Sequence, residues 1–367
     1  MTVTIEKLLQ ENKLTAPRVK DEDWLYYDIE NLVTKQFTSK PATSKRIVDS
    51  VYFLHFLNGK LNQQNLPENM MVNEKKIIPE KTNNSFIHLS INTSINYQIT
   101  CQRGVSETID IIYENTDNNF SSHSIQFEVE ETSKLHLRRL FISPEKSCIN
   151  TYTNIIIANN SKVVITEKNN DNLGHVLDFI DCKLGTKSNF FSLNQSYLSQ
   201  NSRFQNRIFI NGEESNATLH GLAINEKEQA CFYNTHIYHD TENSESHQLF
   251  KSMVKSNSTL EYNGKVTVCK DAQQTNSYQL NQNILLDDFA NVYSRPQLFI
   301  DADDVKCTHG STTGDINEHE VFYLMSRGLD KLTSRKIVLN AFFEEVFNKI
   351  EFKSEQSDVH EILNQIL

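Results

Sequence analysis

The chain has 367 residues, of which 38% are hydrophobic and 23% are charged, and its formal net charge is −11 at pH 7. This length allows two or three domains or one long repetitive domain, and the hydrophobic content is sufficient for a sizeable core, which argues against a disordered chain. The acidic balance argues against nucleic acid or an anionic membrane surface as the partner, because both are negatively charged. No segment approaches the roughly 20 consecutive apolar residues that a membrane-spanning helix needs.

The cysteines and the amino-terminal residues predict a cytoplasmic protein. The six cysteines are widely separated, and none forms a Cys-x-x-Cys pair: Cys101, Cys148, Cys182, Cys231, Cys269 and Cys307. This spacing excludes a zinc finger and a ferredoxin-type run of cluster ligands. The first ten residues lack the basic start and the apolar run of a secretory signal. We therefore expect free thiols in a reducing compartment, most of them buried as small apolar side chains.

The first 75 residues are predicted to form a small region of helices and one hairpin. The residues that fit amphipathic helical segments are Leu8, Leu9, Trp24, Tyr27, Ile29, Leu32 and Val33. A second stretch runs from residue 44 to residue 61, where Asn58-Gly59 favours a tight turn between two short strands. A polar segment that contains proline, residues 62–84, then connects this region to the next.

From residue 85 to residue 306 the sequence has the character of many short strands. The β-branched and aromatic runs are 86–89, 109–113, 125–129, 155–157, 163–166, 176–180, 207–210, 219–224 and 265–268. Because this region is too long for a simple sandwich and lacks the helices of an α/β sheet, it favours a parallel β-solenoid. A large sandwich or barrel stays as the alternative, since there is no strict repeat and only 10 glycines. We expect asparagine to occupy some of the left-handed turn positions instead.

The last 55 residues are predicted to form three amphipathic helices. The first has Asp315 as its N-cap, with Glu318 three residues later, and ends at Arg327-Gly328. Apolar residues mark the second helix at Val338, Phe342, Val346 and Ile350, and the third at Val359, Ile362, Leu363, Ile366 and Leu367. Each helix is expected to bury one face on the body of the protein or on a partner.

The segment that carries most chemical information contains Cys307 and His309. Residues two apart on an extended strand point to the same side, so this pair presents a thiol and an imidazole together. Both groups bind iron and are found at iron–sulfur sites. A Cys-x-His pair is nevertheless common by chance, and a buried cysteine beside a hydrogen-bonded histidine at a strand end explains it more simply.

The residues around this pair favour the iron–sulfur interpretation. They resemble the carboxy-terminal signature of the SufB/SufD family of SUF iron–sulfur cluster assembly scaffold proteins. The matching residues are Ala302-Asp-Asp-Val-Lys-Cys-Thr-His-Gly310, then Thr312-Thr-Gly314, and later Phe322-Tyr-Leu-Met-Ser-Arg-Gly328. Ser311 stands where the family usually has alanine. Segments 263–266, 271–275, 279–286 and 296–298 also resemble the family, and 23–26 does so more loosely.

Within the family the chain resembles the SufD type. SufB-type chains are longer and carry more cysteines in their amino-terminal half. The resemblance is thin between about residues 85 and 230, and segment 238–250 departs from the family pattern because it lacks proline. No role is therefore carried over from the family to that loop.

The resemblance implies a mainly β fold, a right-handed parallel β-helix between two flanking regions. The expected domains are 1–75, an amino-terminal α/β region; 76–312, the β-helix core; and 313–367, a helical domain. The expected partners are a SufB-type paralogue and a SufC-type ATPase, with a SufD homodimer as a further assembly. The residues expected to contact the ATPase are Phe322, Tyr323, Arg327, Phe342 and Val346.

The resemblance also implies a non-enzymatic role in which a transient iron–sulfur cluster is shared with the SufB-type subunit. His309 would be a ligand or a helper of cluster formation, and Cys307 an interface thiol. No G-x-x-x-x-G-K-[ST] motif is present, so we expect no ATP site, and a flavin in the assembled complex is left open. ATP binding by the SufC-type subunits is expected to pull on the helical domain and expose the pair.

Three other interpretations are weighed against this one. A structural solenoid or homodimer would leave Cys307 and His309 inert. A carbohydrate-cleaving solenoid would need paired carboxylates, for which the acidic residues 301, 303 and 304 are available, but the chain has only one tryptophan for sugar stacking. His236, His239 and Asp240 could form a metal site, although a surface turn is the simpler prediction.

Overall fold

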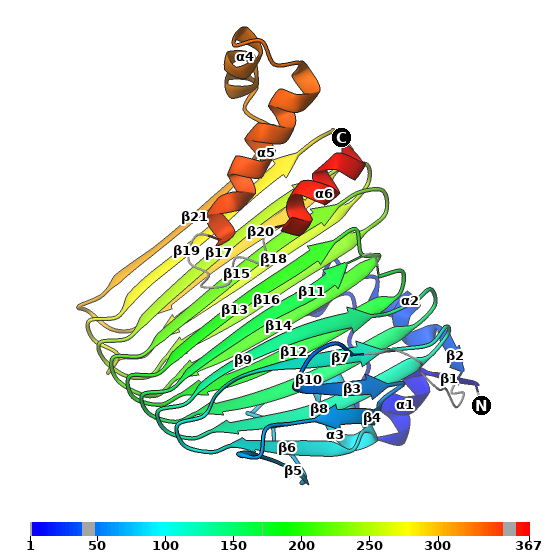
Figure 1. The fold of residues 1–367 in the computed structure, drawn as a ribbon, viewed down its shortest axis with the longest axis vertical. Helices are drawn as coiled ribbons and strands as arrows, with labels where there is room; N and C mark the ends of the chain where they lie inside the picture. The colour runs from blue at the N-terminus through cyan, green and yellow to red at the C-terminus, as the bar shows by residue number, and fades with distance from the viewer. Residues whose placement is uncertain (1, 39–47, 171, 348–356) are drawn as a thin grey trace.

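The computed structural model describes residues 2–38, 48–170, 172–347 and 357–367. Its body is a stack of two long sheets, and consecutive strands alternate between them (Figure 1). The nine-stranded sheet holds β5 (Met70–Glu74), β6 (Asn96–Cys101), β8 (Phe120–Val129), β10 (Cys148–Ile157), β12 (His175–Leu184), β14 (Asn201–Ile210), β16 (Ala230–His239), β18 (Thr259–Val268) and β20 (Asn291–Ile300).

The ten-stranded sheet holds β3 (Phe53–Leu57), β4 (Lys60–Asn65), β7 (Ser106–Glu114), β9 (Lys134–Ile142), β11 (Lys162–Asn170), β13 (Asn189–Tyr197), β15 (Asn216–Asn225), β17 (Glu245–Val254), β19 (Asn276–Leu285) and β21 (Lys306–Gly314). From β6 to β21 all neighbours within a sheet are parallel, so each pair of strands is one coil of a solenoid. The prediction of a parallel β-solenoid is confirmed, and the sandwich and the barrel are excluded.

The turns between strands depend on residues in the left-handed conformation. Among the described residues, 14 that are not glycine have a positive φ, and five of these are asparagines: Asn58, Asn118, Asn160, Asn243 and Asn257. Lysine fills three more of the turns between strands, and Lys13, which follows α1, is a fourth lysine with a positive φ. Asparagine therefore replaces glycine as expected, since it tolerates this conformation, but lysine also does so.

The amino-terminal hairpin is present, and its strands extend the solenoid. Asn58 and Gly59 have φ values of 48° and 87°, as a type I′ turn requires, and β3 pairs antiparallel with β4. β3 also pairs with β7, and β5 pairs with β6, so both sheets begin within the region expected to be separate. Residues 44–47 of the predicted stretch lie outside the described residues.

The predicted strand at 86–89 is wrong, because these residues lie in helix α3 (Ser85–Thr93). The side chain of Asn84 caps this helix by accepting hydrogen bonds from the backbone N–H groups of Phe86 and Ile87. The apolar run that suggested a strand packs against β8 and β10, on the outer face of the nine-stranded sheet. The Asn84 cap marks these residues as the start of a helix, which the apolar run alone does not reveal.

The remaining elements flank the solenoid on opposite faces. On the nine-stranded sheet lie β1 (Thr2–Thr4), α1 (Ile5–Glu11), the 3₁₀ turn η1 (Glu22–Trp24), α2 (Ile29–Thr34) and β2 (Gln36–Thr38). Helices α5 (Lys331–Phe347) and α6 (Ser357–Ile366) pack on the ten-stranded sheet, and α4 (Glu318–Ser326) projects beyond the last coil (Figure 1). None of the helices in the described part of the chain has the length and apolarity to cross a membrane.

The start of α4 lies two residues later than predicted. Asn317, not Asp315, is the N-cap: its side chain accepts from the backbone N–H of His319 and donates to Glu320 Oε1 at 2.6 Å. The Asn317 side chain thus satisfies one of the free N–H groups at the helix start, and Glu320 holds that side chain in place. The predicted end is confirmed, since the C-cap is Arg327 and Gly328 has a φ of +96°.

Candidate functional site

The carboxy-terminal end of the solenoid is open. β20 and β21 are the last strands of their sheets, and no described strand pairs with their outer edges. Large apolar side chains are exposed there, including Phe299 at 51% and Ile300 at 40%. An edge strand offers unpaired N–H and C=O groups to another strand. The end of the stack is therefore a surface on which another β-sheet subunit can continue both sheets.

Cys307 and His309 lie on β21 at this open end and face the space between the sheets. The register of β19 and β21 aligns Cys307 with Ser277 and His309 with Gln279, both of which are buried inside the solenoid. Ser311, two residues further on, forms a hydrogen bond of 2.8 Å with Ser294 on β20, across the coil. The thiol and the imidazole thus point to the same side of the strand.

The surroundings of the two side chains differ. Cys307 is half-buried against a small apolar cluster that includes Val266, Val268 and Ala302, whereas His309 is exposed. Burial raises the pKa of the Cys307 thiol. The thiol is therefore protonated near neutral pH in this chain alone, and it must lose that proton to bind iron.

The described residues contain no group of three or more histidine, cysteine or acidic side chains that could hold a metal ion. Cys307 and His309 can therefore supply only part of a ligand set. Any further ligands have to come from outside the part of this chain that the structure describes. The acidic residues at 301, 303 and 304 do not complete the set, and all three are exposed in the turn between β20 and β21.

The other cysteines behave mostly as predicted. All six are free, and Cys101, Cys148, Cys182 and Cys231 are buried. Burial raises the pKa of Cys101 to about 11 and that of Cys231 to about 12. These thiols are inert at neutral pH, because the thiolate is the reactive form.

His236 and His239 do not share a metal site. His239 lies inside the solenoid, where its two ring nitrogens contact serine hydroxyls at 2.7 and 2.9 Å. His236 lies on the other face of β16, and its Nε2 atom is 2.9 Å from the hydroxyl oxygen of Thr267. Burial lowers the pKa of both histidines to about 4, so both are neutral. The prediction of a surface turn is therefore wrong for these two histidines, although the neighbouring Asp240 is exposed.

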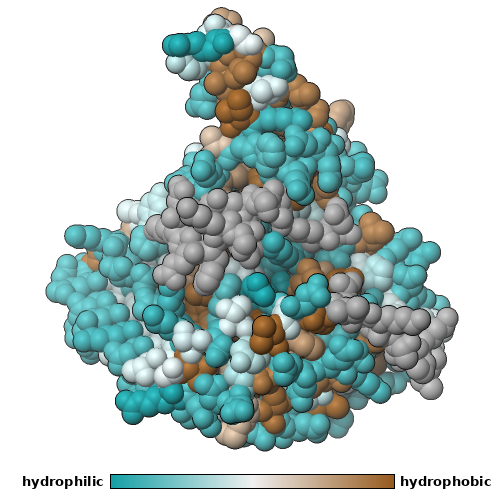
Figure 2. Space-filling view, viewed as in Figure 1, coloured by the Kyte–Doolittle hydropathy of each residue, from teal (hydrophilic) through white to brown (hydrophobic). Residues whose placement is uncertain are grey.

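The projecting helix α4 carries an exposed apolar surface. Phe322 is 70% exposed and Tyr323 is 57% exposed, and the guanidinium of Arg327 lies 5.2 Å from the centre of the Tyr323 ring. Figure 2 shows apolar residues gathered on this projecting part of the molecule. Exposed aromatic side chains beside arginine are typical of protein–protein contacts.

Two of the residues expected to contact a partner belong to the body instead. Val346 is fully buried where α5 packs on the ten-stranded sheet, and its carbonyl oxygen lies 2.7 Å from His220 Nδ1. Phe342 is half-buried, with Lys251 Nζ 4.5 Å from its ring centre. Helical spacing identifies an apolar stripe but not what covers it, and here the solenoid covers it. Ile350, expected on the same stripe, lies outside the described residues.

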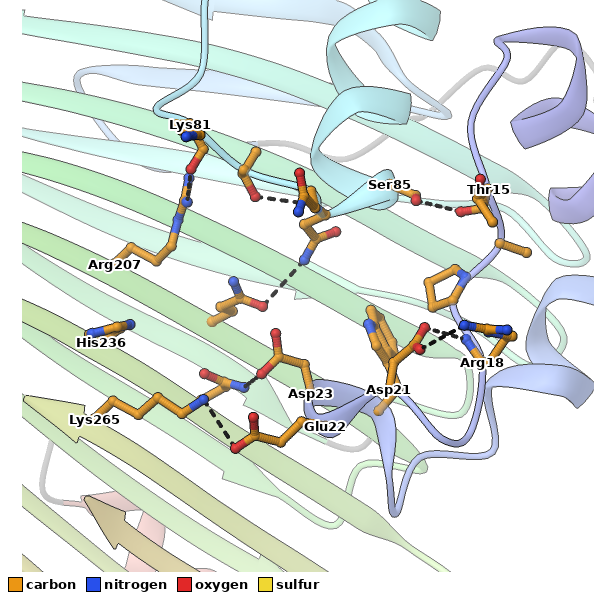
Figure 3. Close-up of a pocket in the computed structure, with 18 of the residues that line it drawn as sticks. Thr15, Arg18, Asp21, Glu22, Asp23, Lys81, Ser85, Arg207, His236 and Lys265 are labelled. Carbon is orange, nitrogen blue, oxygen red and sulfur yellow. Dashed lines mark hydrogen bonds and ion pairs between the residues drawn. The ribbon is translucent and has the colours of Figure 1, made fainter. Parts of the chain in front are cut away.

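A cavity of about 490 Å³ lies on the outer face of the nine-stranded sheet, between residues 15–24, residues 81–85 and strands β14, β16 and β18 (Figure 3). Two cations that line it, Lys265 and Arg207, have carboxylate partners. Lys265 lies 3.2 Å from Glu22, which lowers the pKa of that carboxyl, and Arg207 lies 2.6 Å from Asp181. Lys265 thus holds the amino-terminal segment on the sheet, and Arg207 also donates to the Lys81 carbonyl, so we assign no ligand to the cavity.

A family model described as "SUF system FeS cluster assembly, SufBD core domain" matches residues 112–342. This match covers more than half of the chain and runs from β7 to α5, through both Cys307 and His309. The chain belongs to the SufB/SufD family. The SufB/SufD signature thus lies on the open end of the solenoid and on the projecting helix.

Relatives in the family support the same assignment. The chain is 35% identical over 159 residues to iron-sulfur cluster assembly protein SufD of Escherichia coli. The aligned residues make up 43% of this chain and 37% of that protein. It is 38% identical over 119 residues to a SufBD family protein of Synechocystis, covering 32% of this chain and 26% of the relative. Against SufD of Bacillus subtilis it is 20% identical over 259 residues, covering 69% and 59%. The matches therefore span less than two thirds of these relatives.

Proposed function

We propose that the chain is a non-catalytic, cytoplasmic scaffold subunit of SUF iron–sulfur cluster assembly, which pairs with a SufB-type paralogue and binds a SufC-type ATPase. The observation that carries this proposal is the position of Cys307 and His309. They are two ligand-type side chains on one side of the last strand, at an open end of the solenoid, in a family of cluster assembly proteins.

The incomplete ligand set supports a cluster formed between two subunits. Iron–sulfur clusters are generally held by four protein ligands, and this site offers two. A related solenoid that continues both sheets would bring its own last strand against β21. Its side chains would then complete the ligand set in a space closed to water on both sides.

The exposed side chains of α4 support contact with the ATPase. In this proposal ATP binding draws two SufC-type subunits together, and they pull on α4 of this chain and on the matching helix of its partner. The pull shifts the interface between the two solenoids and opens the site to iron and sulfide. Such a shift requires that the ATP-bound ATPase binds the opened arrangement more tightly.

The test is anaerobic cluster reconstitution on the complex co-purified with its SUF partners, comparing His309→Ala with wild type. We expect His309→Ala to leave the complex assembled and to abolish cluster formation, measured by absorbance and by bound iron and sulfide. His360→Ala, an exposed histidine on α6, is the matched control and should give a normal yield. A normal yield from His309→Ala would overturn the assignment.

The competing interpretation is a structural homodimer with no cluster chemistry. The open sheet edges suit a second copy of this chain as well as a paralogue. Light scattering of the mixed subunits distinguishes the two. A homodimer that persists in the presence of the SufB-type subunit, together with normal cluster yield from both Cys307→Ser and His309→Ala, would favour the structural module.

A further inference from the structure

Gln279 is a buried side chain of β19 that lies directly below His309. The two residues are register partners, and adjacent strands of a sheet are about 4.8 Å apart. Both side chains face the space between the sheets. Gln279 has 0% exposure, because β21 covers it from above and β17 from below.

The amide oxygen of Gln279 is unsatisfied. Its amide interacts with the Tyr262 hydroxyl, but its Oε1 atom has no hydrogen-bond partner among the described residues. A buried amide without partners costs roughly 1–3 kcal/mol for each group left unpaired, and such groups are uncommon in folded proteins. A leucine at this position would avoid that cost, so the amide calls for a role other than packing.

The next amide down the same column has a satisfied oxygen, although its Nε2 is without a partner among the described residues. Gln248 on β17 pairs in register with Gln279, and its Oε1 accepts from the hydroxyls of Thr235 at 2.6 Å and Tyr262 at 3.3 Å. The Tyr262 hydroxyl is thus already directed at Gln248. It also interacts with the amide of Gln279, whose Oε1 is still without a partner, and the open end of the solenoid, where His309 lies, can supply one.

We infer that Gln279 is a positioning residue for His309. This inference rests on the proposed function, and it adds a residue that neither the Cys-x-His spacing nor the resemblance singled out. The exposed ring of His309 turns towards β19, and its N–H on that side donates a hydrogen bond to the unpartnered Oε1 of Gln279. The other ring nitrogen then keeps its lone pair and is directed away from β19, towards the open end and the second subunit.

The chemical reason is general to histidine ligands. A histidine binds a metal through one neutral ring nitrogen, and a hydrogen bond to the other nitrogen fixes the tautomer and the ring orientation. Loss of such a partner typically lowers metal affinity by roughly 10- to 100-fold. On an exposed strand end, a ring without this partner would be free to rotate.

The direct test is the tautomer of His309 in the isolated full chain, measured from ¹⁵N chemical shifts of labelled histidine at about pH 8.5, where an unperturbed imidazole is neutral. The spectrum of His309→Asn assigns the signals. We expect wild type to show one dominant tautomer for His309. Gln279→Leu should show a mixture, and Gln279→Glu, which keeps an acceptor, should restore the dominant tautomer.

Gln248→Leu is the matched control. It removes a buried amide one coil below, and it also leaves the Thr235 and Tyr262 hydroxyls without their acceptor. We expect it to lower the melting temperature and to leave the His309 signals unchanged. Gln279→Leu should keep or raise the melting temperature, because it removes an unsatisfied buried group. Unchanged His309 signals in Gln279→Leu, or an equal change in Gln248→Leu, would overturn the inference.

Cluster reconstitution on the co-purified complex then separates this inference from the proposed function. We expect Gln279→Leu to lower cluster yield by roughly 10-fold and Gln279→Glu to recover it. If the tautomer changes as described but His309→Ala still forms clusters normally, the proposed function fails and the positioning contact stands. If His309→Ala abolishes clusters but the tautomer is insensitive to Gln279→Leu, the proposed function stands and the positioning role fails.

Discussion

One group of charges is buried between the two sheets, around Arg139. Its guanidinium donates to both oxygens of Asp178 at 2.6 and 2.8 Å and also to Glu167. The Asp178 carboxylate accepts from Thr151, and Glu167 accepts from Asn194 at 2.5 Å. A single cation thus faces two carboxyl groups in a dry interior. Burial is the largest influence on Glu167 and raises its pKa to about 8, so Glu167 retains a proton at neutral pH.

We expect Arg139→Met to lower the free energy of unfolding by about 3–5 kcal/mol, because it leaves the buried Asp178 charge without a partner. Chemical denaturation of the full chain measures this change. Arg103→Met is the control, since Arg103 is exposed and lies 3.7 Å from an exposed Glu131. The control should change stability by less than about 0.5 kcal/mol. Equal effects of the two substitutions would contradict the structural role of the buried cluster.

The raised pKa of Glu167 predicts a pH dependence of stability. In the unfolded chain Glu167 titrates near 4.5, and in the folded protein it titrates near 8, so the folded state binds more protons between these values. The free energy of unfolding should therefore fall as the pH rises from about 4.5 to about 8, by at most about 1.4 kcal/mol per pH unit, and then level off.

Glu167→Gln should remove this slope, because the amide does not titrate. Relative to wild type, the variant is expected to gain stability as the pH rises towards 8 and to show a constant difference above it. Denaturation curves at several pH values between about 5 and 9 provide the measurement. Parallel curves for the two proteins over this range would show that Glu167 does not titrate as described.

At the scale of elements, α4 and α5 form one helical arm with two kinds of surface. The carboxy-terminal half of α5 is fixed to the body, where Leu339, Phe343 and Val346 are fully buried. An ion pair adds to this contact, because Lys251 Nζ on β17 lies 2.5 Å from Glu345 Oε2. The other half and α4 expose apolar side chains, including Phe322 and Leu332. The proposed pull by the ATPase would require this combination of one end fixed to the body and one exposed end.

Two matched substitutions distinguish these surfaces. Phe343→Ala should cost about 3–5 kcal/mol of stability, because it leaves a cavity under α5. Phe322→Ala should change stability by less than about 0.5 kcal/mol, since the ring is 70% exposed, while weakening binding of the SufC-type ATPase. Calorimetric binding and thermal unfolding on the same samples report both quantities. Full binding by Phe322→Ala would remove α4 from the contact surface.

At the scale of the whole molecule, the two ends of the solenoid differ. The first coil is extended by the antiparallel strands β4 and β5, which occupy the sheet edges at that end. The last coil has no such cover among the described residues, and β20 and β21 expose both their edges and part of their interior side chains. Natural sheets rarely leave long edges uncovered, so this end is the one suited to assembly.

Hydrogen exchange measures this difference along the stack. In the isolated chain we expect amides of β20 and β21 to exchange faster than those of β10 and β11 in the middle of the stack. Addition of the SufB-type subunit should slow exchange in β20 and β21 and leave the central strands unchanged. Protection that rises with the concentration of this chain alone would instead indicate a homodimer, and no change in either case would exclude the open end as an interface.

The sequence alone determined the features that depend on neighbours along the chain. Strand-forming runs predicted the solenoid, alternation along β21 placed Cys307 and His309 on one side, and Asn58-Gly59 gave the hairpin. The end of α4 at Gly328 was also predictable, because a glycine at a helix end has a local conformational cause. Phe86 to Leu89 shows the limit of such local patterns, since one apolar run suits a strand or a helix until its cap is recognised.

Only the tertiary structure determined which residues lie side by side on adjacent coils. Gln279 and His309 are 30 positions apart, and Arg139 and Glu167 are 28 apart, yet each pair lies on adjacent strands. No periodicity in the sequence aligns them, because the turns differ in length and the repeat is not strict. The burial of Val346 depends in the same way on how α5 docks on distant strands. Register and docking follow from the summed packing of the whole stack, which local sequence does not contain.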